Sequence, residues 1–597
     1  MIWVLIVLTA LFVLAALRMR SRLAALVALP PSDAPPAAPH RFFTAPGVTL
    51  DDATRRAASA WATAHGKEVV DLIPGDLPTI AAMSLAQIVD PATYARDRLA
   101  VGRTAGHAIL VTDEVATRAA VSAPADEVAM IKLAAQLKTF ATATSALVLA
   151  PAERARPEVL GRRRAVLRAL LGPSTPVALI LQPLFFAVLA LGVYLEPIAG
   201  AVALGAWHLQ PIIALVGTRV RARDLLWVTL FRAPVELYLL VRTLAGSWRP
   251  DSGPDPIETR RPTYAALAAT ADTWLEARRE TCPICDSKDL RVHLRFRDLL
   301  QHKPGRFVLE KCRGCGHIFQ NPRLSIAGLD YYYKDFYDGL GEAGISFIFG
   351  LSGAGYLARA RMVKDVVTPE TWLDVGCGHG HFCLAARDEL PTTRFDGLDL
   401  SDGLDLALRR RWIDRGYRGL FPDQADALAG QYQVVSMAHY LEHPREPRAE
   451  LTAAHTVLAP GGHLMIEVPD PEFGLGKLLR TLWLPWFQPQ HQHLLSVGNL
   501  EKLLGEAGFT ALTWHRGRAH QRVDFLFAAF LLLGRLAPPP IQPWRPRSFF
   551  ARVRRAVVWV VGSPLIILGI LADRVVTPFI VRGKRSNTYR VLARRDG

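Results

Sequence analysis

The chain has 597 residues and carries 70 Lys or Arg against 54 Asp or Glu, a net charge of +16. Half of the residues are hydrophobic and the mean hydropathy is positive, at +0.18, which excludes a disordered chain. Six cysteines are too few for a disulfide scaffold. The length predicts three or four domains, and the basic balance indicates either nucleic acid or a membrane surface as a partner.

The first segment is an apolar run, Met1–Leu17, that only Thr9 interrupts. Arginines follow this run rather than precede it, which is typical of an uncleaved anchor and not of a signal peptide. A helix of this length reaches about 25 Å, just enough to cross a bilayer core. We therefore predict a transmembrane anchor within 1–29, with its C-terminal end in the cytosol.

Residues 40–171 are predicted to form a cytosolic domain of unknown function. The segment His107–Val111 is a short apolar run typical of a buried strand, and Val128–Leu149 predicts a helix.

Two further apolar runs, Val177–Leu195 and Ile198–Gly217, lie between basic clusters. Basic residues on both flanks favour a transmembrane hairpin with both ends in the cytosol, and the alternative is a buried helical hairpin of a soluble domain. The next segment, Asp224–Leu244, is apolar but carries charges, which suits an interfacial helix. We therefore predict that 174–248 forms a transmembrane hairpin followed by an interfacial helix.

The order of anchor, cytosolic domain and membrane hairpin resembles that of membrane-bound family 2 glycosyltransferases. The chain has no D-x-D motif and no Q-x-x-R-W motif before residue 250, so a degenerate or regulatory domain is the favoured interpretation.

Four cysteines form two C-x-x-C pairs, Cys282 with Cys285 and Cys312 with Cys315. Each pair turns two thiolates toward one point, and four thiolates satisfy tetrahedral Zn²⁺ without leaving an open position. We therefore predict a zinc ribbon over 273–335 with a structural zinc ion, in a reducing cytosolic compartment.

A cofactor loop is predicted after the short apolar strand Trp372–Val375. Three alternating glycines, Gly376, Gly378 and Gly380, follow Asp374, and a helix begins at about His381. A second strand ends at Asp399, where a carboxylate accepts both hydroxyls of a ribose. The G-x-G-x-G spacing differs from the G-x-G-x-x-G of dinucleotide folds and resembles the S-adenosylmethionine loop of class I methyltransferases.

The second half of the chain, about 281–595, closely resembles bacterial class I methyltransferases that carry an N-terminal zinc ribbon. The matching features are C-x-x-C-G-H (Cys312–His317), N-P-R (Asn321–Arg323), the tyrosine-rich 331–337, D-V-G-C-G (Asp374–Gly378), L-E-H (Leu441–His443) and A-P-G-G (Ala459–Gly462). The resemblance implies an α/β fold, a Rossmann-like sheet over 336–597 after the ribbon, and S-adenosylmethionine as cofactor.

Transfer to a hydroxyl or a carbon acid also needs a base that removes the acceptor's proton, and for each candidate histidine the alternative is a structural role. His443, His493 and His439 are the predicted catalytic residues, with His491 as a further candidate base. One acidic residue usually bonds the adenine amino group in this fold, and Asp426 is preferred over Asp423 for that role.

A long insertion, 522–586, separates the last two predicted strands of the sheet. Its apolar segments, Val523–Gly534 and Ala556–Ala572, are too short to span comfortably and predict a monotopic hairpin in one leaflet. The range 535–585 holds ten Lys or Arg and one acid, a net +9, which indicates contact with anionic lipid headgroups.

The sequence therefore predicts a multi-pass membrane protein whose methyltransferase domain lies on the cytoplasmic face. Its expected partners are membrane lipids and a lipid-linked or glycolipid acceptor, and nucleic acid is not expected. The alternatives are a bifunctional protein with a degenerate glycosyltransferase-like first half, and a zinc-ribbon protein that binds nucleic acid.

Overall fold

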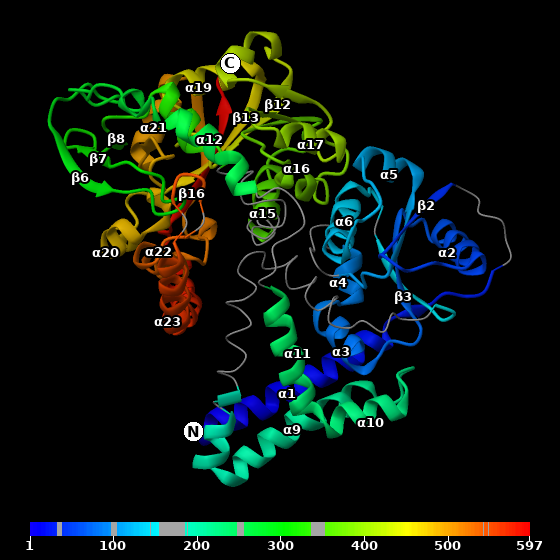
Figure 1. The fold of residues 1–597 in the computed structure, drawn as a ribbon. Helices are drawn as coiled ribbons and strands as arrows, with labels where there is room; N and C mark the ends of the chain where they lie inside the picture. The colour runs from blue at the N-terminus through cyan, green and yellow to red at the C-terminus, as the bar shows by residue number, and fades with distance from the viewer. Residues whose placement is uncertain are drawn as a thin grey trace. The chain divides into compact units, whose positions relative to one another are not determined.

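The computed structural model describes residues 1–32, 39–96, 104–143, 145–153, 186–187, 189–247, 256–335, 353–540, 542–546 and 548–597. The chain folds as two compact units, Met1–Ser252 and Gly253–Gly597 (Figure 1). Much of the predicted first hairpin helix, Val177–Leu195, lies outside the described residues, as do 336–352 at the start of the predicted methyltransferase domain.

The first unit contains a five-stranded sheet of order β1-β5-β3-β4-β2. Its strands are β1 Val27–Ala28, β2 His40–Thr44, β3 Val69–Pro74, β4 Ala108–Thr112 and β5 Ala146–Ala150. Its flanking helices are α2 Asp52–Ala64, α3 Thr79–Ile88, α4 Pro91–Arg96, α5 Asp113–Ala119 and α6 Glu127–Phe140. The strand predicted over 107–111 is confirmed as β4. The helix predicted over 128–149 is wrong in its second half, because the apolar β5 is buried between two parallel strands, β1 and β3.

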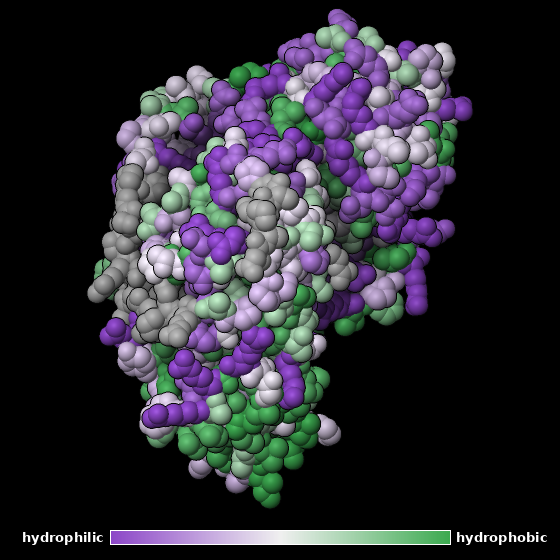
Figure 2. Space-filling model, turned by 90° about the vertical axis from the view of Figure 1, so that its right-hand side faces the viewer, coloured by the Kyte–Doolittle hydropathy of each residue, from purple (hydrophilic) through white to green (hydrophobic). Residues whose placement is uncertain are grey.

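Two apolar helices of this unit, α1 Ile2–Ala24 and α9 Pro197–Leu215, are long enough to cross a membrane. They pack together, and Gln210 donates a hydrogen bond to the Phe12 carbonyl. Figure 2 shows apolar residues gathered in the lower part of the view, at the height at which Figure 1 draws α1 and α9. The single interfacial helix predicted over 224–244 is instead α10 Ala222–Leu230 and α11 Arg232–Ser247, because Pro234 has no N–H to continue the first helix.

The second unit contains a seven-stranded sheet of order β11-β10-β9-β12-β13-β16-β15. Its strands are β9 Thr371–Val375, β10 Arg394–Asp399, β11 Gly416–Arg418, β12 Tyr432–Ala438, β13 Leu458–Pro469, β15 Phe509–His515 and β16 Thr588–Arg595. Its principal helices are α15 Gly353–Lys364, α16 His381–Ala386, α17 Gly403–Arg409, α18 Phe421–Gln424, α19 Pro447–Val457, α20 Gly474–Leu479 and α21 Val497–Glu506. Strands β9 to β13 are parallel and β16 is antiparallel to both of its neighbours, so the predicted α/β sheet is confirmed.

A smaller four-stranded sheet, of order β14-β8-β7-β6, carries the cysteine pairs. Its strands are β6 Leu290–Phe296, β7 Phe307–Cys312, β8 Ile318–Gln320 and β14 His493–Leu494, and the helices α12 Pro256–Ala268 and α13 Ile326–Tyr333 lie beside it in sequence. Because β14 comes from the loop before α21, this small sheet is completed by a segment of the large-sheet domain.

The insertion between β15 and β16 forms the helix pair α22 Asp524–Leu536 and α23 Phe549–Arg582. The prediction of two short apolar segments is wrong for the second, because α23 runs unbroken for 34 residues, about 50 Å, through Pro564 and Pro578. It too is long and apolar enough to cross a membrane. The two helices lie side by side (Figure 1), and the Asp573 carboxylate in α23 accepts from the backbone N–H of Phe525 and Leu526 at 3.0 Å each.

Candidate active site

The glycine loop joins β9 to α16 at the carboxyl end of the parallel strands. Gly376, Gly378 and Gly380 all have positive φ, of 75°, 51° and 75°, a region that favours glycine. A Cβ on Gly376 would lie 2.6 Å from the Tyr440 ring, whereas a Cβ on Gly378 would meet nothing within 4 Å. The loop therefore leaves open space over Gly378, where a ligand can touch the backbone.

Asp399 lies at the end of β10, beside this loop. Its carboxylate accepts from the Gly378 N–H at 2.7 Å and from the Ser401 N–H at 2.8 Å. Each oxygen keeps a further lone pair for a ligand hydroxyl. The structure thus brings together Asp399 and the glycines as the sequence predicted.

Asp374 is buried at the end of β9 and accepts from the Ser436 hydroxyl at 2.6 Å. Burial is the main cause that raises the pKa of Asp374 to about 6, against the opposing effects of Ser436 and Arg359. This carboxyl is therefore a buried group under the loop rather than an exposed ligand for a cation.

Asp426 is exposed in a short 3-10 turn, and no contact ties it to the glycine loop among the described residues. Asp423 is exposed as well. Burial raises the pKa of the nearby Glu450 to about 7, and the negative charge of Asp423 adds to this increase. The role of Asp426 in binding adenine stays a prediction.

His439 directly follows β12 and lies between two carboxylates. Its Nδ1 is 3.4 Å from Glu442 Oε1 and its Nε2 is 3.0 Å from Glu467 Oε1. Burial lowers the pKa of His439, but the two carboxylates outweigh burial and raise that pKa to about 9. An imidazole that is already protonated accepts no proton, so the predicted role of His439 as a general base does not fit the structure.

Glu467, near the end of β13, is the centre of a buried charge cluster that the sequence did not reveal. It is paired with Arg359 of α15 at 2.5 Å, with Arg590 of β16 and with His439. These cations keep the pKa of Glu467 well below its usual range although burial opposes them. Its partners come from both ends of the unit, so only the fold brings them together.

His443 and His491 lie in edge contact, with ring centroids 4.6 Å apart, beside Glu442. His443 Nδ1 is 2.6 Å from the Tyr333 hydroxyl, and His491 Nδ1 is 2.9 Å from the Pro485 carbonyl. The structure therefore brings the predicted His443 and the further candidate His491 into one cluster.

His493 does not lie at an exposed mouth of the fold, as its predicted catalytic role requires. It is buried in β14, with Nδ1 3.2 Å from His317 Nε2 and Nε2 3.2 Å from the Arg445 carbonyl. Both ring nitrogens thus make hydrogen bonds where the small sheet meets the large-sheet domain. These contacts indicate a structural role for His493.

The four ribbon cysteines converge as predicted. The Sγ atoms of Cys282 and Cys315, and those of Cys285 and Cys312, are 3.6 Å apart, and all four lie within 4.8 Å of one another. Four thiolates about 2.3 Å from a tetrahedral zinc ion have nearly this spacing, so the donor set fits zinc.

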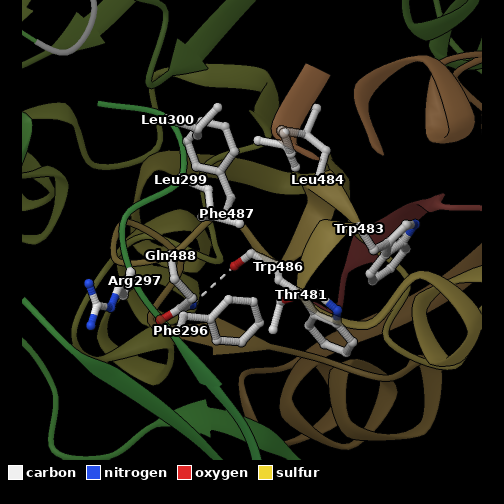
Figure 3. A pocket seen from close by; sticks show the side chains of 11 residues that line it. Phe296, Arg297, Leu299, Leu300, Thr481, Trp483, Leu484, Trp486, Phe487 and Gln488 are labelled. Atoms are coloured by element: carbon white, nitrogen blue, oxygen red, sulfur yellow. Dashed lines mark hydrogen bonds between the residues drawn. The ribbon is translucent and has the colours of Figure 1, made fainter. Parts of the chain in front are cut away.

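A small apolar pocket, of about 20 Å³ and partly open to solvent, lies between the small sheet and α22. Leu299, Leu300, Leu484 and Phe487 gather on one side of it (Figure 3). The loop that carries Phe487 also carries His491. The two rings stack, with their centroids 4.8 Å apart. One loop thus joins the pocket to the histidine cluster.

Comparison with known proteins agrees with this geometry. Residues 357–513 match a family model described as "Methyltransferase domain". Similar curated proteins include the ubiquinone biosynthesis O-methyltransferases of Pseudomonas paraeruginosa (31% identity; 16% of this chain, 43% of the relative) and Vibrio atlanticus (28%; 24% and 66%). A similar solved structure is a SAM-dependent methyltransferase from Archaeoglobus fulgidus (15% identity, TM-score 0.27; 42% of this chain, 99% of that one).

The chain thus spans less than two thirds of the length of these curated relatives, and none of the matches covers half of the chain itself. The residues matched by the family model, 357–513, contain the glycine loop and Asp399. Residues 357–513 are therefore similar to a methyltransferase domain.

Proposed function

We propose that this protein is an S-adenosylmethionine-dependent methyltransferase that works at the cytoplasmic face of a membrane on a lipid-linked or glycolipid acceptor. The observation that carries the proposal is the apolar side of α23, which is exposed along its whole length while both ends of the helix are fixed to the catalytic unit. We expect anionic lipid headgroups as partners and no nucleic acid.

The glycine loop and Asp399 would hold the cofactor. The open space over Gly378 suits the adenosine, and Asp399 would accept its two ribose hydroxyls. When bound, S-adenosylmethionine supplies an electrophilic methyl group for in-line transfer. The chain contributes the position of the acceptor and a site from which bulk water is excluded.

The exposed stripe of α23 supports a membrane surface as its partner. Large apolar side chains recur every three or four residues, and Phe550, Val561 and Phe579 are 82%, 73% and 68% exposed. Soluble proteins rarely expose so long an apolar face. Arg552, Arg554, Arg574 and Arg582 lie exposed on the same helix, where they can bind anionic headgroups.

The ends of α23 support a position within one leaflet rather than a span. Before the helix, Gln542 donates to the Gln301 carbonyl at 2.6 Å and Trp544 donates to the His302 carbonyl at 3.2 Å. After it, the chain enters β16 in the centre of the large sheet. Both ends are thus held by one compact unit, so a crossing helix would pull that unit apart.

The apolar pocket supports an acceptor with a lipid portion. Its wall includes Leu531 of α22, the helix that packs on α23, and its loop reaches His491. A chain that enters from the membrane side would fill the pocket and place its headgroup toward the cluster. We also propose that the ribbon cysteines hold a structural zinc ion.

The one-leaflet position predicts the same sidedness for both ends of α23. We expect Arg552→Cys and Lys584→Cys to react with a membrane-impermeant maleimide in inside-out vesicles and not in right-side-out vesicles. Val561→Cys, in the middle of the stripe, should be protected in both. Labelling of the two ends from opposite sides would contradict this position.

The acceptor class predicts where a transferred methyl group appears. Membranes that contain the full chain, incubated with S-adenosylmethionine carrying a labelled methyl, should yield label in the solvent-extractable lipids, and membranes with the Asp399→Ala variant should not. Label confined to the protein or to water-soluble products would refute a lipid-linked acceptor.

A further inference from the structure

Glu442 is a buried carboxylate whose charged neighbour, the His439 imidazole, is shared with Glu467. Its side chain is 1% exposed, and neither oxygen makes a hydrogen bond within the part of the chain that the structure describes. Burying a charge this deeply costs several kcal/mol unless it is well paired, and His439 divides its charge between two carboxylates, so a second cation would stabilise Glu442. His439 Nδ1, at 3.4 Å from one oxygen, is not aligned as a hydrogen bond.

The hydrogen bonds of His491 decide which of its nitrogens carries the proton. Its Nδ1 is 2.9 Å from the Pro485 carbonyl oxygen, which can only accept, so Nδ1 is the protonated nitrogen. The neutral ring therefore presents the lone pair of Nε2, and Nε2 lies 3.8 Å from Glu442 Oε1. A lone pair and a carboxylate oxygen facing each other repel unless a cation lies between them.

His443 is arranged in the same way. Its Nδ1 is 2.6 Å from the Tyr333 hydroxyl, and that hydroxyl also donates to the Gln490 carbonyl at 3.3 Å. Tyr333 has one proton; in the tautomer in which Gln490 takes it, Nδ1 donates to Tyr333 and Nε2 keeps its lone pair for a metal. Metal-binding histidines in proteins are oriented by such a bond from the second ring nitrogen.

From this arrangement we propose that Glu442, His443 and His491 bind a divalent metal ion, separate from the ribbon. One ligand atom from each lies within 4.8 Å of the other two. A set of two imidazoles and one carboxylate suits Zn²⁺, Mn²⁺, Fe²⁺ or Co²⁺ and leaves positions open for other ligands. A zinc ion held by the four ribbon cysteines would have no open coordination position.

The open positions give the metal a role that rests on the proposed function. Tyr440, two residues before Glu442, packs against Gly376 of the cofactor loop, so the cluster borders the methyl donor's site. An acceptor hydroxyl bound to the metal loses its proton to solvent water more readily. Its oxygen then forms the bond to the methyl carbon while the carbon–sulfur bond breaks and sulfur keeps the electron pair.

Cobalt titration of the full-length protein in detergent tests the metal site without any cofactor. We expect metal-free wild type to bind two Co²⁺ per chain, only one of which gives thiolate charge-transfer absorption. Glu442→Gln and His491→Ala should each bind one Co²⁺ with that absorption intact, which also shows that the ribbon is folded. The control His463→Ala, a half-buried histidine on β13, should bind two.

A single Co²⁺ in the wild type, or two in both Glu442→Gln and His491→Ala, would overturn the metal site. Binding of S-adenosylmethionine to the same samples is measured separately by calorimetry. Loss of cofactor binding in the wild type with two Co²⁺ still bound would refute the proposed function and leave the metal site standing.

Discussion

Asp399→Ala is expected to weaken binding of S-adenosylmethionine about 100-fold or more. The carboxylate would accept two ribose hydroxyls, and hydrogen bonds to a charged group contribute about 1.5–3 kcal/mol each. It also holds the Gly378 N–H at 2.7 Å, so its loss would release the middle of the glycine loop. Isothermal calorimetry on the full chain measures the change.

The matched control for this variant is Asp402→Ala, three residues further on, where the side chain is 92% exposed. It should bind the cofactor as the wild type does. Asp399→Asn keeps one acceptor oxygen, so its affinity for S-adenosylmethionine should lie between those of the wild type and Asp399→Ala. Equal affinity in wild type and Asp399→Ala would refute the ribose role of Asp399.

Cys282→Ser is expected to remove the ribbon's zinc ion and to lower the unfolding temperature of the second unit by about 10 °C or more. A structural zinc site contributes on the order of 10 kcal/mol to the folding of a small domain. The loss should extend beyond the ribbon, because β8 pairs with β14 and His317 contacts His493 of the large-sheet domain. Elemental analysis and thermal unfolding measure both effects.

Lys288→Ser is the control, since this exposed residue lies in the same knuckle and has no part in the thiolate set. It should retain zinc and the wild-type unfolding temperature. A wild type without zinc, or an unchanged unfolding temperature in Cys282→Ser, would contradict a structural zinc ion.

The glycine loop and the cluster of four cysteines could be predicted because each is a local pattern. The glycines that follow Asp374 need no distant residue to define their turn, and each cysteine pair is a single knuckle. The strands of the large sheet were predictable for the same reason, since each is a short apolar run between turn residues.

The states of the histidines could not be predicted in this way. The pKa of His439 is raised because Glu442 and Glu467 lie on either side of the ring. His493 is buried because β14 joins the small sheet. The sequence also gave no sign that Glu442, rather than a histidine alone, is the centre of a cluster. These properties depend on segments that only the folded chain brings into contact.

The position of β16 has a consequence for the order in which the protein is made. This strand lies between β13 and β15, yet in the chain it follows α22 and α23. A ribosome therefore makes the long apolar helix before the strand that completes the sheet. The large sheet cannot be completed until α23 has emerged, so this helix is available to contact lipid before the sheet closes.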